Sequence, residues 1–221
     1  MLSVYLGGGD HWSQVAAELE SLGVVELLEG GPTLLFGRRV LGKGQNGVVV
    51  RCRHEVAGGE WACKLRRRDA SRPNLLWEGH VLRLANGVGV GPRLLTFSRN
   101  VIVMEEVLGS PLGVGAVDAE LVRRLLGQAR ALDRIGVSHN ELARGGRHVL
   151  VRGGEPVIID FESATVGGRR SNVLQLLNAL VRDPAGLRAA ARRYKEERSE
   201  DAFRELVELV VREVESRSAK A

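Results

Sequence analysis

The hydrophobic pattern of this 221-residue chain changes once, from strand-like in the first half to helical in the second. In the first half, short apolar and β-branched runs alternate with glycine, proline and asparagine, which is typical of strands and turns. The predicted strands span 24–28, 33–36, 39–41, 48–53, 61–65 and 101–107. We expect the first two, which Gly30-Gly31-Pro32 separates, to form a hairpin.

Apolar residues at helical spacing predict helices in both halves, with two more strands near the end. The helices are expected at 10–22, 72–85, 118–136, 171–182, 184–195 and 199–216, and the strands at 148–151 and 157–160. Asp10, Ser71 and Asp118 are expected to begin the first three helices, because short polar side chains can accept a bond from an unpaired backbone N–H there.

These elements predict an α+β fold with a β-rich N-lobe, which has one main helix, and a reduced, mainly α-helical C-lobe. Gly109-Ser110-Pro111 marks the boundary, so we expect the N-lobe at 38–108 and the C-lobe at 109–221. Residues 1–37 are too short to stand alone and are expected to be a helix–hairpin extension packed on the N-lobe. A partial winged helix is the alternative for this extension.

Composition leaves the partner class open. The net charge of +5 and the pI near 9.7 would suit an acidic protein surface, RNA or ribosomes. Arginines are spread among acids over the whole chain, however, and only 4% of the residues are aromatic, which leaves few stacking surfaces for single-stranded nucleic acid. RNA or ribosome association is therefore a secondary expectation beside a protein partner.

The sequence also bears on localisation and redox state. It has neither eighteen successive apolar residues nor a signal-peptide pattern at its start, so we expect a cytoplasmic protein without a membrane partner. Cys52 and Cys63 lie in apolar, strand-like runs rather than in metal or redox spacings. We expect them to be buried free thiols.

The first candidate for chemistry is the glycine-rich motif Gly42-Lys43-Gly44-Gln45-Asn46-Gly47. A Rossmann unit uses a similar motif between a strand and a helix. Here the β-branched run 48–50 follows, so the loop is expected to join two antiparallel strands, where its amides can lie over phosphates. An ordinary glycine-rich hairpin would have the same pattern.

Lys64 is the second candidate, because lysine is rare in this chain, with four against 28 arginines, and this one lies in the apolar strand 61–65. A lysine is costly to bury without a partner. Glu78, close to the packed face of the next predicted helix, is the candidate partner. The pair would hold the ammonium toward the α and β phosphates of a nucleotide.

Two further segments extend the pattern. The buried strand that begins at Val101 leads into a connector, in which the backbone of Glu105 to Val107 could bond an adenine edge. Asp160 ends the apolar run 157–159, where a carboxylate can be presented to Mg²⁺, and Phe161 is expected to pack beneath it.

In order and approximate spacing, these motifs follow the protein-kinase signature over residues 40–165. The residues that carry the resemblance are Gly42, Gly44, Gly47, Val49, Lys64, Glu78, Met104-Glu105, His139-Asn140-Glu141-Leu142 and Asp160-Phe161. The chain resembles a minimal atypical serine/threonine protein kinase, similar to the RIO family and to small archaeal kinases.

The resemblance implies ATP and Mg²⁺ or Mn²⁺ as cofactors, with Lys64, Glu141 and Asp160 as the catalytic residues. The residues that it implies for nucleotide binding are Gly42, Lys43, Gly44, Gln45, Asn46, Gly47, Val49, Ala62, Lys64, Glu78, Met104, Glu105 and Val107. The implied metal ligands are Asp160, His148 and Glu162.

The chain departs from the family pattern at three of these positions. Glu141 stands where the family has its catalytic-loop aspartate, and Glu162 where it has a glycine. The metal-binding asparagine is matched by Gly146 if residues are counted, or by His148 if its place before the strand is kept. Since imidazole is a better ligand for Mn²⁺ than for Mg²⁺, His148 predicts that activity favours manganese.

Four functions fit the sequence. The first is a Ser/Thr protein kinase that also phosphorylates itself. A small-molecule kinase of the choline or aminoglycoside type is the second, although only 61 residues remain after Asp160 for its substrate region. A nucleotide-binding pseudokinase or slow ATPase is the third, and a non-catalytic binder of RNA or ribosomes is the fourth.

Overall fold

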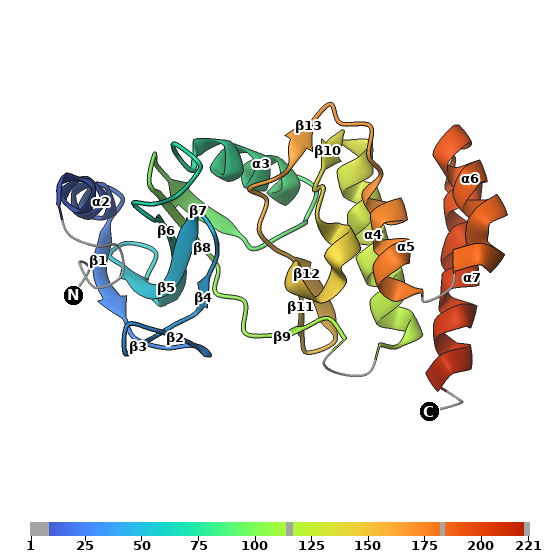
Figure 1. Cartoon of the computed structure of the whole chain (residues 1–221), viewed down its shortest axis with the longest axis horizontal. Coiled ribbons are helices and arrows are strands. Elements are labelled where there is room, and N and C mark those ends of the chain that lie inside the picture. The colour runs from blue at the N-terminus through green and yellow to red at the C-terminus, as the bar shows by residue number, and fades with distance from the viewer. Residues whose placement is uncertain (1–8, 114–116, 182–183, 219–221) are drawn as a thin grey trace. The chain divides into compact units, whose positions relative to one another are not determined.

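The structure is a computed structural model that describes residues 9–113, 117–181 and 184–218. It has the predicted α+β fold class, with a β-rich N-terminal part and a mainly helical C-terminal part (Figure 1). The chain divides into two compact units. The N-terminal unit comprises Met1–Arg83 and Pro92–Glu106, and the C-terminal unit comprises Leu84–Gly91 and Val107–Ala221.

The N-terminal unit is built on one antiparallel sheet with the strand order β1-β5-β6-β8-β7, and β4 pairs with β5 beside this path. Its strands are β1 (Val24–Leu28), β4 (Gly42–Lys43), β5 (Gly47–His54), β6 (Glu60–Arg66), β7 (Leu94–Phe97) and β8 (Val101–Met104). A separate hairpin consists of β2 (Thr33–Leu35) and β3 (Arg38–Val40), and the helices are α2 (Asp10–Ser21) and α3 (Leu76–Asn86). Helix α3 begins in this unit and ends in the C-terminal unit.

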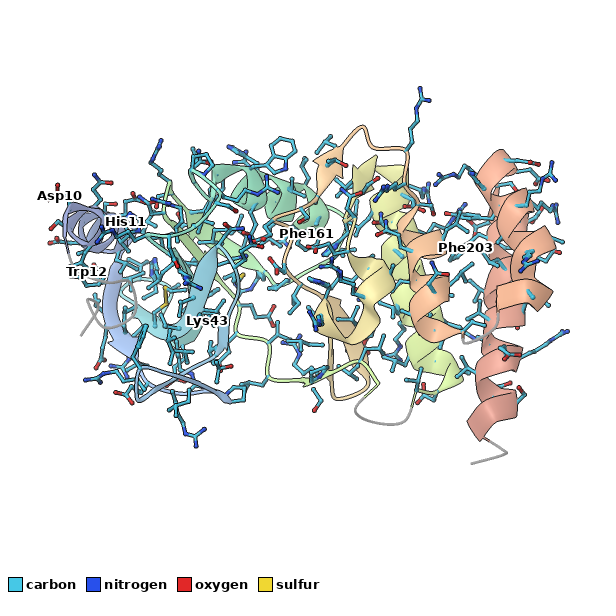
Figure 2. All side chains as sticks on the ribbon, in the orientation of Figure 1. Asp10, His11, Trp12, Lys43, Phe161 and Phe203 are labelled. Carbon is cyan, nitrogen blue, oxygen red and sulfur yellow. A yellow bond between two sulfur atoms is a disulfide. The ribbon has the colours of Figure 1, made fainter. Side chains whose placement is uncertain are left out.

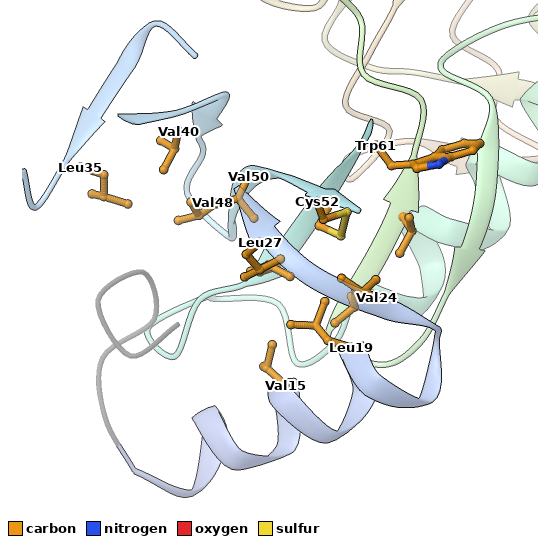
Figure 3. Packing of buried hydrophobic residues seen from close by; sticks show 14 residues of the cluster. Val15, Leu19, Val24, Leu27, Leu35, Val40, Val48, Val50, Cys52 and Trp61 are labelled. Atoms are coloured by element: carbon orange, nitrogen blue, oxygen red, sulfur yellow. A yellow bond between two sulfur atoms is a disulfide. The ribbon is translucent and has the colours of Figure 1, made fainter. Parts of the chain in front are cut away.

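The hairpin predicted between 24–28 and 33–36 is wrong. Strand β1 pairs with β5, and β2 pairs with β3. In this register Leu27 lies opposite Cys52, and both are buried with Val15 and Leu19 of α2 in one apolar core (Figure 3). Burial of apolar side chains against the large sheet favours this pairing over a local hairpin, which would leave both strands without a core.

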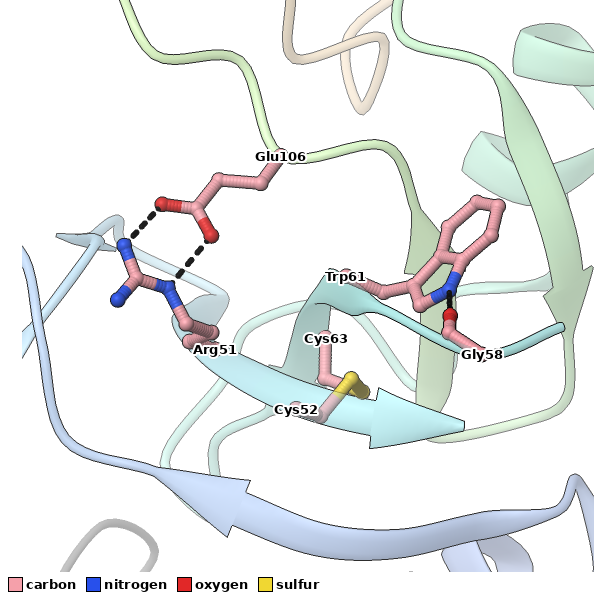
Figure 4. Close-up of a disulfide and its surroundings, with 6 residues drawn as sticks. All are labelled: Arg51, Cys52, Gly58, Trp61, Cys63 and Glu106. Atoms are coloured by element: carbon pink, nitrogen blue, oxygen red, sulfur yellow. Dashed lines mark hydrogen bonds and ion pairs between the residues drawn. A yellow bond between two sulfur atoms is a disulfide. The ribbon is translucent and has the colours of Figure 1, made fainter. Parts of the chain in front are cut away.

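The prediction of free thiols is also wrong, because Cys52 and Cys63 form a disulfide between β5 and β6 (Figure 4). The antiparallel register puts Cys52 opposite Trp61 and Cys63 opposite Val50, so that the two cysteines are diagonal neighbours. Their Cα atoms are 6.1 Å apart, which is within the range that a disulfide spans. Sequence spacing alone does not reveal this register.

Two element boundaries differ from the prediction. Helix α3 begins at Leu76 rather than at 72, because the side chain of Asn74 accepts the N–H of Leu76 at 3.1 Å. Ser71 therefore does not cap the helix. The strand predicted at 101–107 ends at Met104, so the connector from Glu105 onward lies outside it, and β7 was not predicted.

The C-terminal unit has four helices and two small sheets among its described residues. The helices are α4 (Ala119–Arg134), α5 (Asn172–Leu180), α6 (Arg188–Glu197) and α7 (Glu200–Ser218), with two 3-10 helices, η1 (Leu142–Arg147) and η2 (Pro184–Leu187). The strands are β9 (Ser110–Pro111), β10 (Val137–Ser138), β11 (Val149–Arg152), β12 (Glu155–Ile158) and β13 (Thr165–Val166). Strand β11 pairs with both β9 and β12, and β10 pairs with β13.

Local sequence signals explain the two central helices of this unit. As predicted, Asp118 caps α4, because its carboxylate accepts the N–H of Leu121 at 2.7 Å. The side chain of Ser171 caps α5 in the same way. None of the described helices is long and apolar enough to cross a membrane.

Candidate functional site

The glycine-rich motif forms the predicted turn between two antiparallel strands. Gly42 lies opposite Val49 and Lys43 opposite Val48, and the N–H of Gly44 donates to the carbonyl of Gly47 at 2.8 Å. A side chain at position 47 would bring its Cβ to 3.0 Å from Cε of Lys64. Glycine is therefore needed here to let the loop lie directly over the lysine.

Residues 67–72, which precede α3, hold this loop through hydrogen bonds. The side chain of Asn46 is buried, and its carbonyl accepts the Ser71 hydroxyl at 2.9 Å and the N–H of Arg72 at 3.1 Å. The N–H of Arg67 donates to the carbonyl of Asn46 at 2.9 Å, and its guanidinium donates to the carbonyl of Gly44. Asn46, predicted as a nucleotide contact, thus bonds the segment before α3 with its side chain.

The predicted ion pair between Lys64 and Glu78 is present, with 2.7 Å between Nζ and Oε1. Both side chains are 7% exposed, so neither charge is well solvated. In the sheet, Lys64 lies opposite Val49 on one side and Ile102 on the other, and Glu78 belongs to the first turn of α3. Such a buried pair has a strict geometry, which fixes the position of the ammonium group in the sheet.

The connector after β8 is fixed at two places. The N–H of Glu105 donates to the carbonyl of Arg93 at 2.8 Å, and the N–H of Arg93 donates back to the Glu105 carboxylate at 3.2 Å. Arg51 binds both carboxylate oxygens of Glu106. Ala62 and Met104, which were also predicted at the nucleotide, lie opposite each other on β6 and β8 at the start of this connector.

In the C-terminal unit, His139 joins the predicted catalytic loop to the predicted metal motif. Its side chain is fully buried, and its Nε2 bonds the carbonyl of Ile159 at 3.0 Å. The ring contacts those of Phe161 and His148 edge-on, at centroid distances of 5.1 and 5.5 Å. Phe161, labelled in Figure 2, is 1% exposed, in agreement with the predicted packing beneath Asp160.

Burial lowers the pKa of His139 to about 4, with a smaller contribution from the neighbouring His148. The bond to the Ile159 carbonyl and the nearby carboxylates of Asp160 and Glu141 oppose this shift but do not cancel it. The ring is therefore neutral at physiological pH. His139 thus connects the two segments through hydrogen bonding and ring packing, and it does not act as a general acid.

Asn140 and Asp160 both have left-handed backbone conformations, with φ of 74° and 66°. Residues other than glycine rarely adopt this conformation, and asparagine and aspartate tolerate it best. The side chain of Asn140 donates to the carbonyl of Ser163 at 2.8 Å, which ties the catalytic loop to the segment after the metal motif. These two backbone conformations change the direction of the chain within the two motifs that were predicted to carry chemistry.

The two carboxylates of the metal motif can share an ion. Oxygen atoms of Asp160 and Glu162 lie within 4.8 Å of each other, and both residues are partly buried. Hard carboxylate oxygens are the ligands that Mg²⁺ and Mn²⁺ prefer. Glu141 is separately oriented by Arg144, whose Nη1 lies 2.8 Å from its Oε1.

The two positions considered for the family's asparagine differ in their surroundings. A Cβ at Gly146 would lie 2.4 Å from the carbonyl oxygen of Leu112, so no side chain fits there. His148, whose backbone lies between η1 and β11, is buried at 7% exposure, and its Nδ1 makes no hydrogen bond. Of these two positions, only His148 has a side chain, and it is not part of the group of possible metal ligands to which Asp160 and Glu162 belong.

Asp133 and Asn172 support the predicted catalytic loop, and the sequence analysis did not single them out. The side-chain oxygen of Asn172 accepts the N–H of His139 at 2.8 Å, and its NH₂ group donates to the carbonyl of Val137 and to Asp133. Asp133 also accepts bonds from Tyr194. Polar residues inside apolar helical runs are the one signal that could have pointed to them.

The structure therefore groups the predicted residues into two sets. The set in the N-terminal unit comprises the glycine loop, the pair formed by Lys64 and Glu78, and the connector at Glu105. The set in the C-terminal unit comprises Glu141 and the candidate metal ligands. Each set is held by hydrogen bonds and ion pairs within its own unit.

Comparison with known proteins gives one partial relative and no match to a family model. A probable bifunctional tRNA threonylcarbamoyladenosine biosynthesis protein of Methanothermobacter thermautotrophicus is 34% identical over 87 residues. The similarity covers 38% of this chain and 16% of that protein. The chain thus corresponds to a small part of the relative's length.

Proposed function

We propose that the protein is an ATP-dependent phosphotransferase, namely an atypical serine/threonine protein kinase that transfers the γ-phosphoryl group of ATP to a Ser or Thr hydroxyl, including its own. The observation that carries this proposal is the buried ion pair of Lys64 and Glu78 directly under a glycine loop. A lysine is rarely buried in an apolar sheet unless it serves an anion or a fixed partner, and here it can do both.

In this proposal, residues of the N-terminal unit bind the nucleotide. Lys64 donates to the α and β phosphates while Glu78 keeps its ammonium in place. Amides of the loop 42–47 bond the phosphate oxygens, and the main chain of the connector bonds the adenine edge. Since these groups are fixed before the nucleotide arrives, little ordering is needed on binding.

Residues of the C-terminal unit hold the metal and the acceptor. Asp160 and Glu162 would bind Mg²⁺ or Mn²⁺, with Nε2 of His148 as a further ligand. The ion, when bound, offsets the negative charge that develops on the transferring phosphoryl group. Glu141, oriented by Arg144, accepts the hydroxyl proton and aligns the attacking oxygen.

A second candidate is a slow ATPase or nucleotide-gated switch that takes part in tRNA modification. The name of the partial relative favours this role, as do Glu141 and His148 at two positions where the family has other residues. The same nucleotide set would serve this function, so the two candidates differ in the acceptor of the phosphoryl group, which would be water instead of a hydroxyl.

Transfer of labelled γ-phosphate from ATP tests the proposal. The protein itself and a generic basic protein serve as acceptors, with Lys64→Ala and Glu141→Ala beside the wild type. Lys195→Ala, at an exposed position of helix α6, is the control. We expect labelled protein that is lost in the first two variants and kept in the control. Release of inorganic phosphate without labelled protein would favour the ATPase, and full activity of Lys64→Ala would refute both.

The same assay tests the metal. With His148 as a ligand, we expect higher activity with Mn²⁺ than with Mg²⁺, because imidazole binds Mn²⁺ better. In His148→Asn, which restores an oxygen ligand, this preference should shrink or reverse. Equal or higher activity of the wild type with Mg²⁺ would contradict the role of His148.

A further inference from the structure

Arg51 binds Glu106 of the connector through a two-pronged contact. Its Nε and Nη2 donate to the two carboxylate oxygens, each at 2.6 Å (Figure 4). The side chain of Glu106 is only 8% exposed, and that of Arg51 is 23% exposed. Glu60 adds a second carboxylate 3.1 Å from Nε of Arg51. Such planar, bidentate pairs fix the orientation of both partners, which a single surface ion pair does not.

The sheet register shows what this contact spans. Arg51 on β5 lies opposite Ala62 on β6, and Ala62 lies opposite Met104 on β8, so the three residues form one row across the sheet. Glu106 follows two residues after Met104, where the chain has left β8. The side chain of Glu106 bonds Arg51, the first residue of this row. The bond therefore connects the chain after β8 to β5, although β6 lies between these two strands in the sheet.

The residue before Glu106 is tied on the other side. The N–H of Glu105 donates to the carbonyl of Arg93, and the N–H of Arg93 donates to the carboxylate of Glu105. The guanidinium of Arg93 in turn lies 4.6 Å from the ring centroid of Trp61. Two consecutive residues of the connector are thus anchored by their side chains, Glu105 to the residue before β7 and Glu106 to β5.

These anchors restrict the rotation of the peptide groups on both sides of Glu106. One group carries the carbonyl of Glu105 and the N–H of Glu106, and the next carries the carbonyl of Glu106 and the N–H of Val107. An adenine presents an acceptor at N1 and a donor at N6, whereas guanine presents a donor and an acceptor at the corresponding positions. A connector with fixed peptide groups can pair with only one of these patterns.

We propose that Arg51 is a positioning residue that sets nucleobase selectivity, by holding Glu106 so that the connector presents the pattern complementary to adenine. The inference rests on the proposed nucleotide-binding function. Arg51 does not touch the base in this account. Without Arg51, the peptide groups of the connector can rotate, and the difference between the affinities for ATP and GTP becomes smaller.

The chain provides a matched control on the same strand. Arg53 also lies on β5 and also pairs with a glutamate, Glu26 of β1, but both side chains are about half exposed and neither belongs to the connector. Replacing Arg53 removes an arginine and an ion pair from β5 without touching Glu106. A general effect of charge on this strand would therefore appear in both variants.

The experiment measures the dissociation constants of ATP and GTP for the full-length wild type, Arg51→Met, Glu106→Met, the double variant and Arg53→Met. We expect the wild type and Arg53→Met to prefer ATP, and Arg51→Met to reduce the ATP-to-GTP preference about tenfold. The double variant should lose no more than either single variant, because the two residues act as one unit. Arg51→Lys keeps the positive charge and loses the bidentate contact with Glu106, so it should also show a reduced ATP-to-GTP preference. It replaces Arg51→Met in the experiment if that variant fails to fold.

The outcomes separate this inference from the proposed function. If the wild type prefers ATP and the Arg51 variants keep that preference unchanged, the inference is overturned and the proposed function stands. Equal losses of ATP and GTP affinity would also overturn it, because they indicate a general structural role. If the wild type binds neither nucleotide, the proposed function fails and the inference fails with it.

Discussion

His139 links two motifs that are far apart in the sequence, and it can do so only as a neutral ring. Burial lowers its pKa to about 4, and its ring packs between Phe161 and His148 while Nε2 bonds the Ile159 carbonyl. Protonation would place a charge inside this cluster, where no solvent is available to stabilise it. The conformation of the catalytic loop should therefore depend on pH.

We expect the free energy of unfolding to fall as the pH is lowered from 7 to 5. In the unfolded chain His139 regains a pKa near 6.5, so between that value and about 4 the unfolded state binds a proton that the native state does not. The loss should be about 2 kcal/mol at pH 5. Chemical denaturation at several pH values measures it, with His139→Gln and, as a control, His80→Gln at an exposed position. An unchanged pH dependence in His139→Gln would contradict this account.

Single residues were predictable where a charge had to be buried. Lys64 stands alone in an apolar strand, and its need for a partner pointed to Glu78, which the structure confirms as an ion pair. Asn172 and Asp133 were missed because each is an ordinary polar residue in a helical pattern. Their importance depends on which backbone N–H groups come near them, and that is a property of the packed unit.

Strands β5 and β6 carry Gly47, Val49, Ala62 and Lys64 of the predicted nucleotide-binding residues, and the two strands are joined covalently. The disulfide between Cys52 and Cys63 lies in the same core as Val15 and Leu19 of α2 (Figure 3). Lys64 directly follows Cys63, so the bond helps to fix the strand on which the lysine lies. Disulfides occur in intracellular proteins of hyperthermophiles and are otherwise typical of oxidising compartments.

Reduction of this disulfide should destabilise the protein. The two cysteines are 11 residues apart in the sequence, and closing a loop of that size is expected to contribute about 3 kcal/mol. Thermal unfolding with and without reductant measures the effect, and the Cys52→Ala/Cys63→Ala variant is the control that reductant should not affect. An equal unfolding temperature of the wild type in both conditions would refute a stabilising role.

Elements were predictable where the signal is local. Asp118 and the apolar face that follows it predicted α4, and the β-branched run after the glycine loop predicted β5. The pairing of β1 was not predictable, because it depends on burial of Leu27 against α2 and β5. The start of α3 was predicted too early, because Ser71 and Asn74 are equally good caps and the bond of Ser71 to Asn46 decides between them.

At the scale of the whole molecule, the C-terminal unit connects its last helices to the catalytic loop through Asp133. This carboxylate is 5% exposed and accepts bonds from Ser171 and Asn172 at α5 and from Tyr194 and Arg198 at the end of α6. Since Asn172 holds the backbone of the catalytic loop, the chain beyond Asp160 acts as its support.

Removing this support should weaken both stability and phosphoryl transfer. Asp133→Ala leaves several buried donors without an acceptor, which should cost about 3 kcal/mol of unfolding free energy. Asp133→Asn keeps part of the network and should be milder, and Asp201→Asn, on the exposed side of α7, is the control. If Asp133→Ala unfolds at the same denaturant concentration as the wild type, the network is not a support.

The fold class followed from the sequence because the hydrophobic period changes at one place and the motifs keep a fixed order. The predicted α+β class, with strands first and helices later, is confirmed. The contact of Arg51 with Glu106 was beyond sequence reasoning, since it joins residues 55 positions apart. Side-chain pairs of that kind emerge only from the register of the sheet.

Equilibrium binding of ATP is the most direct test of the central claim that Lys64, held by Glu78 under the glycine loop, binds the nucleotide phosphates. We expect the wild type and Lys195→Ala to bind ATP with equal affinity, and Lys64→Ala to bind it at least tenfold more weakly, since a charge-assisted contact to phosphate contributes about 1.5–3 kcal/mol. Equal affinity of Lys64→Ala and the wild type would contradict the account.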